Sequence, residues 1–281
     1  MKRAFGLFLL LTFLCGVGTA ACQTPAPPAP PTPTPPTIEL TIAGSSEMTP
    51  LLAALIAAFY LRHTDVEIAF QAVNSTFGLD QVRQGTAALG AVAAAPPENM
   101  WAAPIALDAV AVIVHPDNPL RNLTAAQIEL IFSGQKWRWH ELDIQLPQDE
   151  IIVISREEQS ATRAFFQARM MRNLDVTTTA IVMPGSTAVI DFVAAHPNAI
   201  GYVSQGLLTA KVKPVRIENL APAQSQIAAQ TYALVRPWYL VAPQEPSGAI
   251  RQFVDFCLSP EGQKIVAQNY APVRPGHSKG D

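Results

Sequence analysis

The stretch from Ser155 to Phe166 contains residue types that could bind an anion. Arg156 and Arg163 lie in it, and a guanidinium fork matches the geometry of an oxyanion. Ser160 and Thr162 are favourable helix N-cap types, and the residues after them have helical spacing. Free backbone N–H groups and the positive end of a helix dipole face out of such a turn. Because an apolar run precedes the stretch, the pattern predicts a strand, a hydroxyl-rich turn and a helix arranged around an anion.

Three other stretches repeat this order of strand, small-residue turn and helix. They begin at Ile38, Val66 and Ile181, and their turns contain Gly44-Ser45-Ser46, Ser75-Thr76 and Ser186-Thr187. Strands that alternate with helices favour an α/β fold with mostly parallel sheets. In such sheets ligands bind beyond the carboxyl ends of the strands, where these turns are expected. For Ser186 and Thr187 we expect helix capping alone.

Composition limits the function classes. The chain has 281 residues, of which 49% are hydrophobic, enough for one large or two medium domains. The net charge of −3 and the lack of a basic stripe argue against a nucleic-acid partner. The five histidines lack metal-ligand spacing, and the sequence has no nucleophile elbow and no Cys/His pair at plausible spacing. We therefore expect no metal, no cofactor and no enzymatic activity, and an anion site built from local dipoles and a few arginines.

Six short motifs occur in the same order as in a known family. The sequence resembles the phosphate-binding lipoproteins of ABC transporters, within the type II periplasmic-binding-protein superfamily. The motifs are Gly44-Ser45-Ser46 with Pro50-Leu51, Ser75-Thr76-Phe77-Gly78, Asp117-Asn118-Pro119-Leu120 through Trp139, Arg156 through Arg163, Ala199-Ile200-Gly201-Tyr202, and Ser259-Pro260-Glu261-Gly262-Gln263. Each is weak alone, but six in order favour this family strongly.

The resemblance implies a two-lobed α/β fold with mostly parallel sheets and two crossover hinge strands. The crossings are expected near residues 105–112 and 232–240. Lobe 1 would then comprise residues 38–109 and 235–281, and lobe 2 residues 110–234. Closure of the two lobes around the ligand would be driven by binding energy.

The implied function is that of a monomeric solute-binding protein that captures a tetrahedral oxyanion, phosphate by default, and delivers it to an ABC transporter permease. The turns and motifs together give the candidate anion-binding residues. Arg163 could either reach the anion or lie outside it along the helix. The candidates are Ser45, Ser46, Ser75, Thr76, Arg156, Ser160, Ala161, Thr162 and Arg163.

The sequence also departs from the family. Alanine dominates residues 88–95, where the family has an Asp and a Ser-Arg pair, and Gln159 and Ala161 replace two glycines. The family carboxylate accepts the proton of hydrogen phosphate and thereby rejects sulfate. Glu47 could take its place, but we expect Glu47 to be a solvated residue at a helix N-terminus. Selectivity between phosphate and sulfate should then be weak. Sulfate, molybdate or tungstate remain alternative ligands, and a degenerate fold that acts as an envelope sensor or interaction module is the alternative function.

The N-terminus has the features of an export signal. Two basic residues precede an apolar run at Phe5–Val17, which is too short to span a bilayer comfortably. Residues 1–21 resemble a lipoprotein signal peptide, with Cys22 as the lipidated residue, although Thr19 stands where an aliphatic residue is usual. The alternative is an ordinary signal peptide that is cleaved after small residues, with Cys22 incidental. Residues 22–37 are rich in Pro, Thr and Ala and predict an extended linker. The domain is thus expected to be lipid-anchored on the outer face of the cytoplasmic membrane.

One cysteine remains in the part that is expected to fold. Cys257 lies among Phe253, Val254, Phe256 and Leu258, which indicates a small buried hydrophobic residue. Without a second cysteine in the domain, no internal disulfide is expected.

Overall fold

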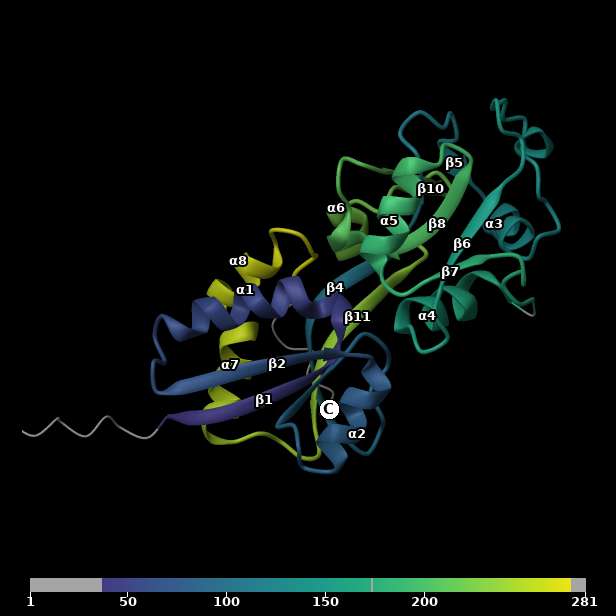
Figure 1. Cartoon of the computed structure of the whole chain (residues 1–281). Coiled ribbons are helices and arrows are strands. Elements are labelled where there is room, and N and C mark those ends of the chain that lie inside the picture. The colour runs from purple at the N-terminus through teal and green to yellow at the C-terminus, as the bar shows by residue number, and fades with distance from the viewer. Residues whose placement is uncertain (1–36, 173, 274–281) are drawn as a thin grey trace, which may run out of the picture. The chain divides into compact units, whose positions relative to one another are not determined.

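The computed structural model of the chain describes residues 37–172 and 174–273, which belong to a single compact unit (Figure 1). The predicted signal peptide, Cys22 and nearly all of the predicted linker lie outside the described residues. None of the described helices combines the length and the apolar character that a membrane span requires.

The first half of the fold is a parallel arrangement of strands joined by helices. Strand β1 pairs in parallel with both β2 and β3. Helix α1 buries one apolar face, and Pro50 lies in its first turn, where a missing N–H costs no hydrogen bond. The Asn74 side chain caps α2 by accepting a hydrogen bond from the N–H of Phe77. The elements are β1 (Ile38–Ser45), a 3-10 helix (Ser46–Met48), α1 (Thr49–Tyr60), β2 (Val66–Val73), α2 (Ser75–Arg83) and β3 (Leu89–Val92).

Strands β4 (Trp101–Val114) and β11 (Val235–Ala242) connect the two parts of the sheet. The first part of β4 pairs antiparallel with β11, and its last residues pair antiparallel with β8 (Ala199–Ser204). Within the described sheets, every antiparallel strand pair includes β4 or β11, and the other pairs are parallel. This arrangement confirms the two predicted crossover strands, although β11 begins at Val235 rather than near residue 232.

The second half again alternates strands with helices. Strand β6 pairs in parallel with β7 and β8, so the carboxyl ends of β6 and β7 lie at the same edge. Its elements are β5 (Asn122–Leu123), α3 (Ala125–Phe132), a 3-10 helix (Trp139–Leu142), β6 (Ile152–Arg156), α4 (Ala161–Met170), β7 (Ile181–Met183), α5 (Ser186–Ala195), β8, a 3-10 helix (Gln205–Leu207), β9 (Lys213–Pro214), β10 (Arg216–Ile217) and α6 (Gln224–Ala228). The chain ends with α7 (Gly248–Leu258) and α8 (Pro260–Val266) after β11.

The apolar core divides between the two parts of the sheet. One large cluster packs α1, α7 and α8 around β1 and β3, and another packs α3 and α4 around β8. Cys257 is fully buried in the first cluster, as predicted. Trp139, the last residue of the third motif, is buried, and its indole N–H donates to the carbonyl of Asn198. Ser259, the first residue of the sixth motif, ends α7 and caps α8.

Candidate anion-binding site

Glu47 lies at the centre of a buried group of charged side chains. It belongs to the short 3-10 helix that follows β1, and only 5% of it is exposed. The expectation of a solvated glutamate was therefore wrong. The side chain turns inward because basic and hydroxyl groups from other elements satisfy its charge there.

Four side chains donate hydrogen bonds to the Glu47 carboxylate. Arg156 Nη1 and Ser186 Oγ donate to Oε1, the latter over 3.0 Å. Thr162 Oγ1 and Arg236 Nη2 donate to Oε2 over 2.6 and 3.1 Å. Both oxygens therefore have two donors each, and two of the four donors are guanidinium groups.

The parallel strands explain why three of these donors meet. Arg156 is the last residue of β6, and Thr162 lies in the first turn of α4, which follows it. Ser186 is the first residue of α5, which follows the neighbouring strand β7. We expected Ser186 only to cap that helix, but Gly185 is the N-cap residue, and the Ser186 hydroxyl bonds Glu47 instead. Adjacent parallel strands thus deliver their following turns to one place.

Arg236 reaches the site from the hinge strand β11. It lies opposite Asp108 of β4 in the strand register, and its Nε and Nη2 donate to Asp108 Oδ2 over 3.1 and 2.9 Å. Ser204 donates to the other Asp108 oxygen over 2.8 Å. Arg236 is 1% exposed, and its Nη1 has no hydrogen-bond partner among the described residues. One guanidinium therefore serves two carboxylates and keeps an unused donor.

Our sequence interpretation missed Arg236 and Asp108. Both interrupt long apolar runs, at residues 104–114 and 232–241, that overlap the central strands β4 and β11. A charge in such a strand is rare unless it is paired, and this was the available signal. Their partnership could not be inferred, because it depends on the register of two strands that are far apart in the sequence.

The carboxylates respond differently to burial. Burial acts to raise the pKa of Glu47. The charges of Arg236 and Arg156 and the hydrogen bond from Thr162 outweigh burial and hold that pKa below its ordinary value. Burial raises the pKa of Asp108, and the contacts with Arg236 and Ser204 offset this only in part. Glu47 is accordingly ionised at neutral pH. Its charge faces the guanidinium ions of Arg156 and Arg236, and Asp108 contacts Arg236.

Arg156 is fixed from two sides. Besides Glu47, it contacts Ser186 through Nη1 over 3.0 Å. The neighbouring Glu157 accepts hydrogen bonds from Nε and Nη2, both over 2.9 Å. The guanidinium plane is therefore held with Nη1 directed at the Glu47 carboxylate.

The other predicted site residues make no hydrogen bond to Glu47 among the described residues, and their own contacts differ. Ser160 caps α4, and Arg163 donates to the Arg156 carbonyl and to Gln167 over 2.9 and 3.1 Å. The Ser75 hydroxyl accepts a hydrogen bond from the N–H of Ala93, in the alanine segment, over 3.2 Å. The remaining candidates differ in exposure: Ser45 is buried, Ala161 is half-buried, and Ser46 and Thr76 are exposed.

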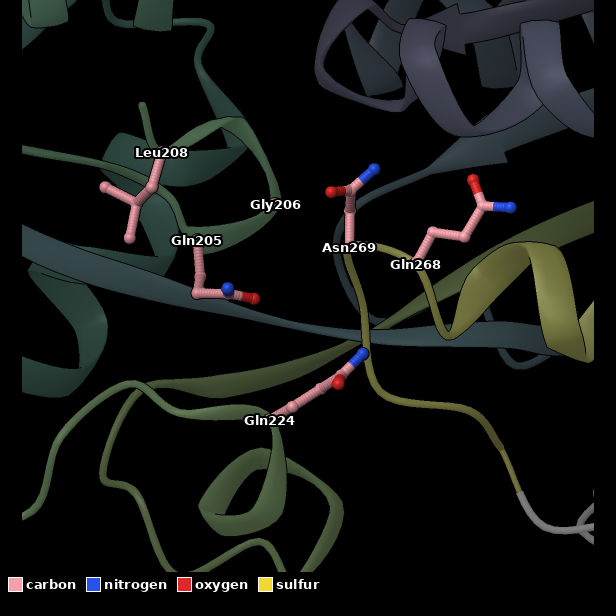
Figure 2. A pocket seen from close by; sticks show the side chains of 6 residues that line it. All are labelled: Gln205, Gly206, Leu208, Gln224, Gln268 and Asn269. Atoms are coloured by element: carbon pink, nitrogen blue, oxygen red, sulfur yellow. The ribbon is translucent and has the colours of Figure 1, made fainter. Parts of the chain in front are cut away.

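A pocket lined mainly by side-chain amides lies apart from the Glu47 group. Figure 2 shows this pocket near the strands of the hinge, lined by side-chain amides and Leu208. Gln224 in this pocket donates to the carbonyl of Ala267 over 2.7 Å. Its lining holds no charged side chain, so it offers no counterpart to the two arginines at Glu47. The lining residues are Gln205, Gly206, Leu208, Gln224, Gln268 and Asn269. Within residues 37–172 and 174–273, no three His, Cys, Asp or Glu side chains are grouped to hold a metal ion.

Comparison with known proteins identifies the family. A family profile described as the PBP superfamily domain matches residues 29–261. The phosphate-binding protein PstS of Bacillus subtilis is 30% identical over 244 residues, which cover 83% of this chain and 80% of that protein. The chain belongs to the PstS family. PstS of Pseudomonas aeruginosa PAO1 is 27% identical and covers 95% of this chain and 94% of its own length.

Solved structures of PstS-like proteins agree with the fold. A substrate-binding protein of a phosphate ABC transporter from Clostridium perfringens, solved with bound phosphate, superposes with a TM-score of 0.78 at 28% identity. The match covers 84% of this chain and all of that one. The predicted family and the two-lobed α/β fold are thereby confirmed.

Proposed function

We propose that this chain is an extracytoplasmic solute-binding protein that captures a tetrahedral oxyanion, phosphate by default, and delivers it to an ABC importer. The observation that supports the proposal is the convergence of Arg156, Arg236, Thr162 and Ser186 on one anionic group. Buried donors that satisfy a carboxylate can also satisfy the oxygens of another oxyanion.

The chemistry of the donors favours a ligand with more acceptor positions than a carboxylate. Arg236 keeps Nη1 without a partner among the described residues, although the residue is buried. A tetrahedral oxyanion has four oxygens, so it could accept from this donor as well as from the four that Glu47 now uses.

The proposal also covers further binding residues, the boundaries of the lobes and the attachment to the membrane. Around the arginines, Ser45, Ser75, Ser160 and Arg163, with the backbone at Ala161, complete the binding turns, and Ser46 and Thr76 border them. Lobe 1 comprises residues 38–109 and 235–281, and lobe 2 residues 110–234. A lipid anchor at Cys22 keeps the protein at the membrane as a monomer beside its permease partner, with no enzymatic role.

Isothermal titration calorimetry of the purified protein with phosphate, sulfate, molybdate and tungstate tests the proposal. We expect binding of phosphate, and weak discrimination between phosphate and sulfate because residues 88–95 lack the usual carboxylate. Absence of heat with all four anions would refute solute capture and favour the envelope sensor or interaction module instead.

A further inference from the structure

We infer that the Glu47 carboxylate is an internal ligand of the anion site, so that an oxyanion binds by displacing it. The inference rests on the proposed function and goes beyond it, because it assigns to one residue of the chain the control of affinity. It also concerns a residue that our sequence interpretation had placed in solvent.

Glu47 occupies the donors that the ligand needs. Arg156 and Thr162 were predicted as anion ligands from the turn between β6 and α4, independently of Glu47. In the structure, both donate to the Glu47 carboxylate. An external oxyanion cannot accept from Arg156 Nη1 and Thr162 Oγ1 with the same geometry while Glu47 remains between them.

The two buried guanidinium ions already have carboxylate partners without a solute. Arg156 contacts Glu47 and the half-exposed Glu157, and Arg236 contacts Glu47 and Asp108. Addition of a phosphate or sulfate ion would leave an excess of negative charge in a site removed from water, which is costly. Departure of Glu47 removes one negative charge and frees four donors at once.

The Glu47 contacts also join distant parts of the chain. Glu47 follows β1, whereas Arg156, Thr162 and Ser186 follow β6 and β7. These elements fall in the predicted lobes 1 and 2, so Glu47 joins the same parts of the chain that a captured ligand would join. Glu47 therefore stabilises a ligand-free arrangement that competes with the liganded one. The apparent affinity for the oxyanion is lower when Glu47 occupies the site in a larger fraction of molecules.

Two substitutions test the inference. Glu47→Ser removes the carboxylate and leaves space, and Glu47→Gln keeps the size but removes the charge. Both are titrated with phosphate by calorimetry beside the wild type, and circular dichroism confirms that each variant is folded. Glu39→Gln is the matched control, because it removes the same charge at an exposed position on β1. We expect phosphate to bind Glu47→Ser about tenfold or more tightly than the wild type, and the control to be unchanged.

The outcomes separate this inference from the proposed function. If the wild type binds phosphate as tightly as both variants or more tightly, the inference is overturned and the proposed function stands. If Glu47→Gln in that case has lost phosphate binding, Glu47 would instead be a proton acceptor for hydrogen phosphate. Binding by Glu47→Ser without binding by the wild type supports the internal ligand and refutes solute capture by the natural protein. Absence of binding by every form overturns both. If Glu47→Ser does not fold, Glu47→Gln decides by the same criterion.

Discussion

At the scale of single residues, Arg156 is the side chain on which the site depends most. Glu157 fixes one side of its guanidinium, and Nη1 on the other side meets Glu47 and Ser186. Its substitution removes a charge-assisted buried contact and frees the neighbouring carboxylates.

We therefore predict that Arg156→Ala weakens phosphate binding by about 2–4 kcal/mol, the usual cost of losing such a contact. Arg169→Ala is the control, because Arg169 lies exposed on α4 and, among the described residues, donates only to the carbonyl of Ala233. Calorimetry measures both. An unchanged affinity in Arg156→Ala would place that residue outside the ligand site.

Glu47 also predicts how stability depends on pH. Its pKa in the folded protein lies below the ordinary value of 4.5, so its contribution is fully present above pH 4.5 and is lost as the pH falls through the folded-state pKa. The stability of the wild type relative to Glu47→Gln should therefore decrease below pH 4.5. A tenfold difference in proton affinity between the folded and unfolded states corresponds to about 1.4 kcal/mol of stability.

Urea denaturation at several pH values measures this difference. The elevated pKa of Asp108 gives the opposite slope, but Asp108 is present in both proteins, so much of its effect cancels in the comparison. A constant difference between pH 7 and pH 3 would contradict an ionised Glu47 held by the two arginines.

The predicted and missed residues differ in the range of their interactions. Arg156 and Thr162 could be found because a local strand, turn and helix indicate an anion site. Glu47 was misassigned, since the sequence around it indicates only a helix start, and its partners are more than a hundred positions away. Asp108 and Arg236 meet through strand register, which composition and spacing do not determine.

At the scale of elements, close contact between α2 and β1 positions the predicted turn at Ser75 and Thr76. A Cβ atom on Gly78 would lie 2.5 Å from the carbonyl oxygen of Ala43 and 2.6 Å from the Cα of Gly44. Backbone atoms cannot move aside as a flexible side chain can, so only glycine permits this approach.

Gly78→Ala should therefore destabilise the protein by about 1–3 kcal/mol, the typical cost of overpacking. The matched control is Gly185→Ala, because nothing lies within 4 Å of a Cβ built there and its φ of −171° is accessible to alanine. Thermal and urea unfolding compare the two. Equal stability of both variants would contradict the close contact.

Most elements could be predicted from the sequence, and the exceptions have physical causes. Strands β2 and β7 begin at the predicted residues Val66 and Ile181, since alternation or an apolar run marks them clearly. Strand β11 was expected from near residue 232, but the strand begins only at Val235. The apolar residues Tyr232 and Leu234 before it are buried by side-chain packing, so hydrophobicity there does not indicate a strand.

At the scale of the whole molecule, the internal ligand should affect the spacing of the two lobes. If Glu47 joins them without a solute, the wild type should show little change in radius of gyration when phosphate is added. Glu47→Ser should be more expanded without phosphate and should contract with it. Small-angle X-ray scattering measures both, and an equal contraction of the wild type would contradict the prediction.

The pairing of Arg236 with Asp108 across the two hinge strands also bears on the kinetics of capture. Both residues lie on the two predicted crossover strands, so we expect their ion pair to persist when the lobes separate. Arg156, at the end of β6 in the predicted lobe 2, would move with that lobe only. An incoming anion would then meet Arg236 first and Arg156 only after closure. We expect Arg236 to govern chiefly the association rate and Arg156 the dissociation rate, so that one arginine sets how fast a solute is found and the other how long it stays.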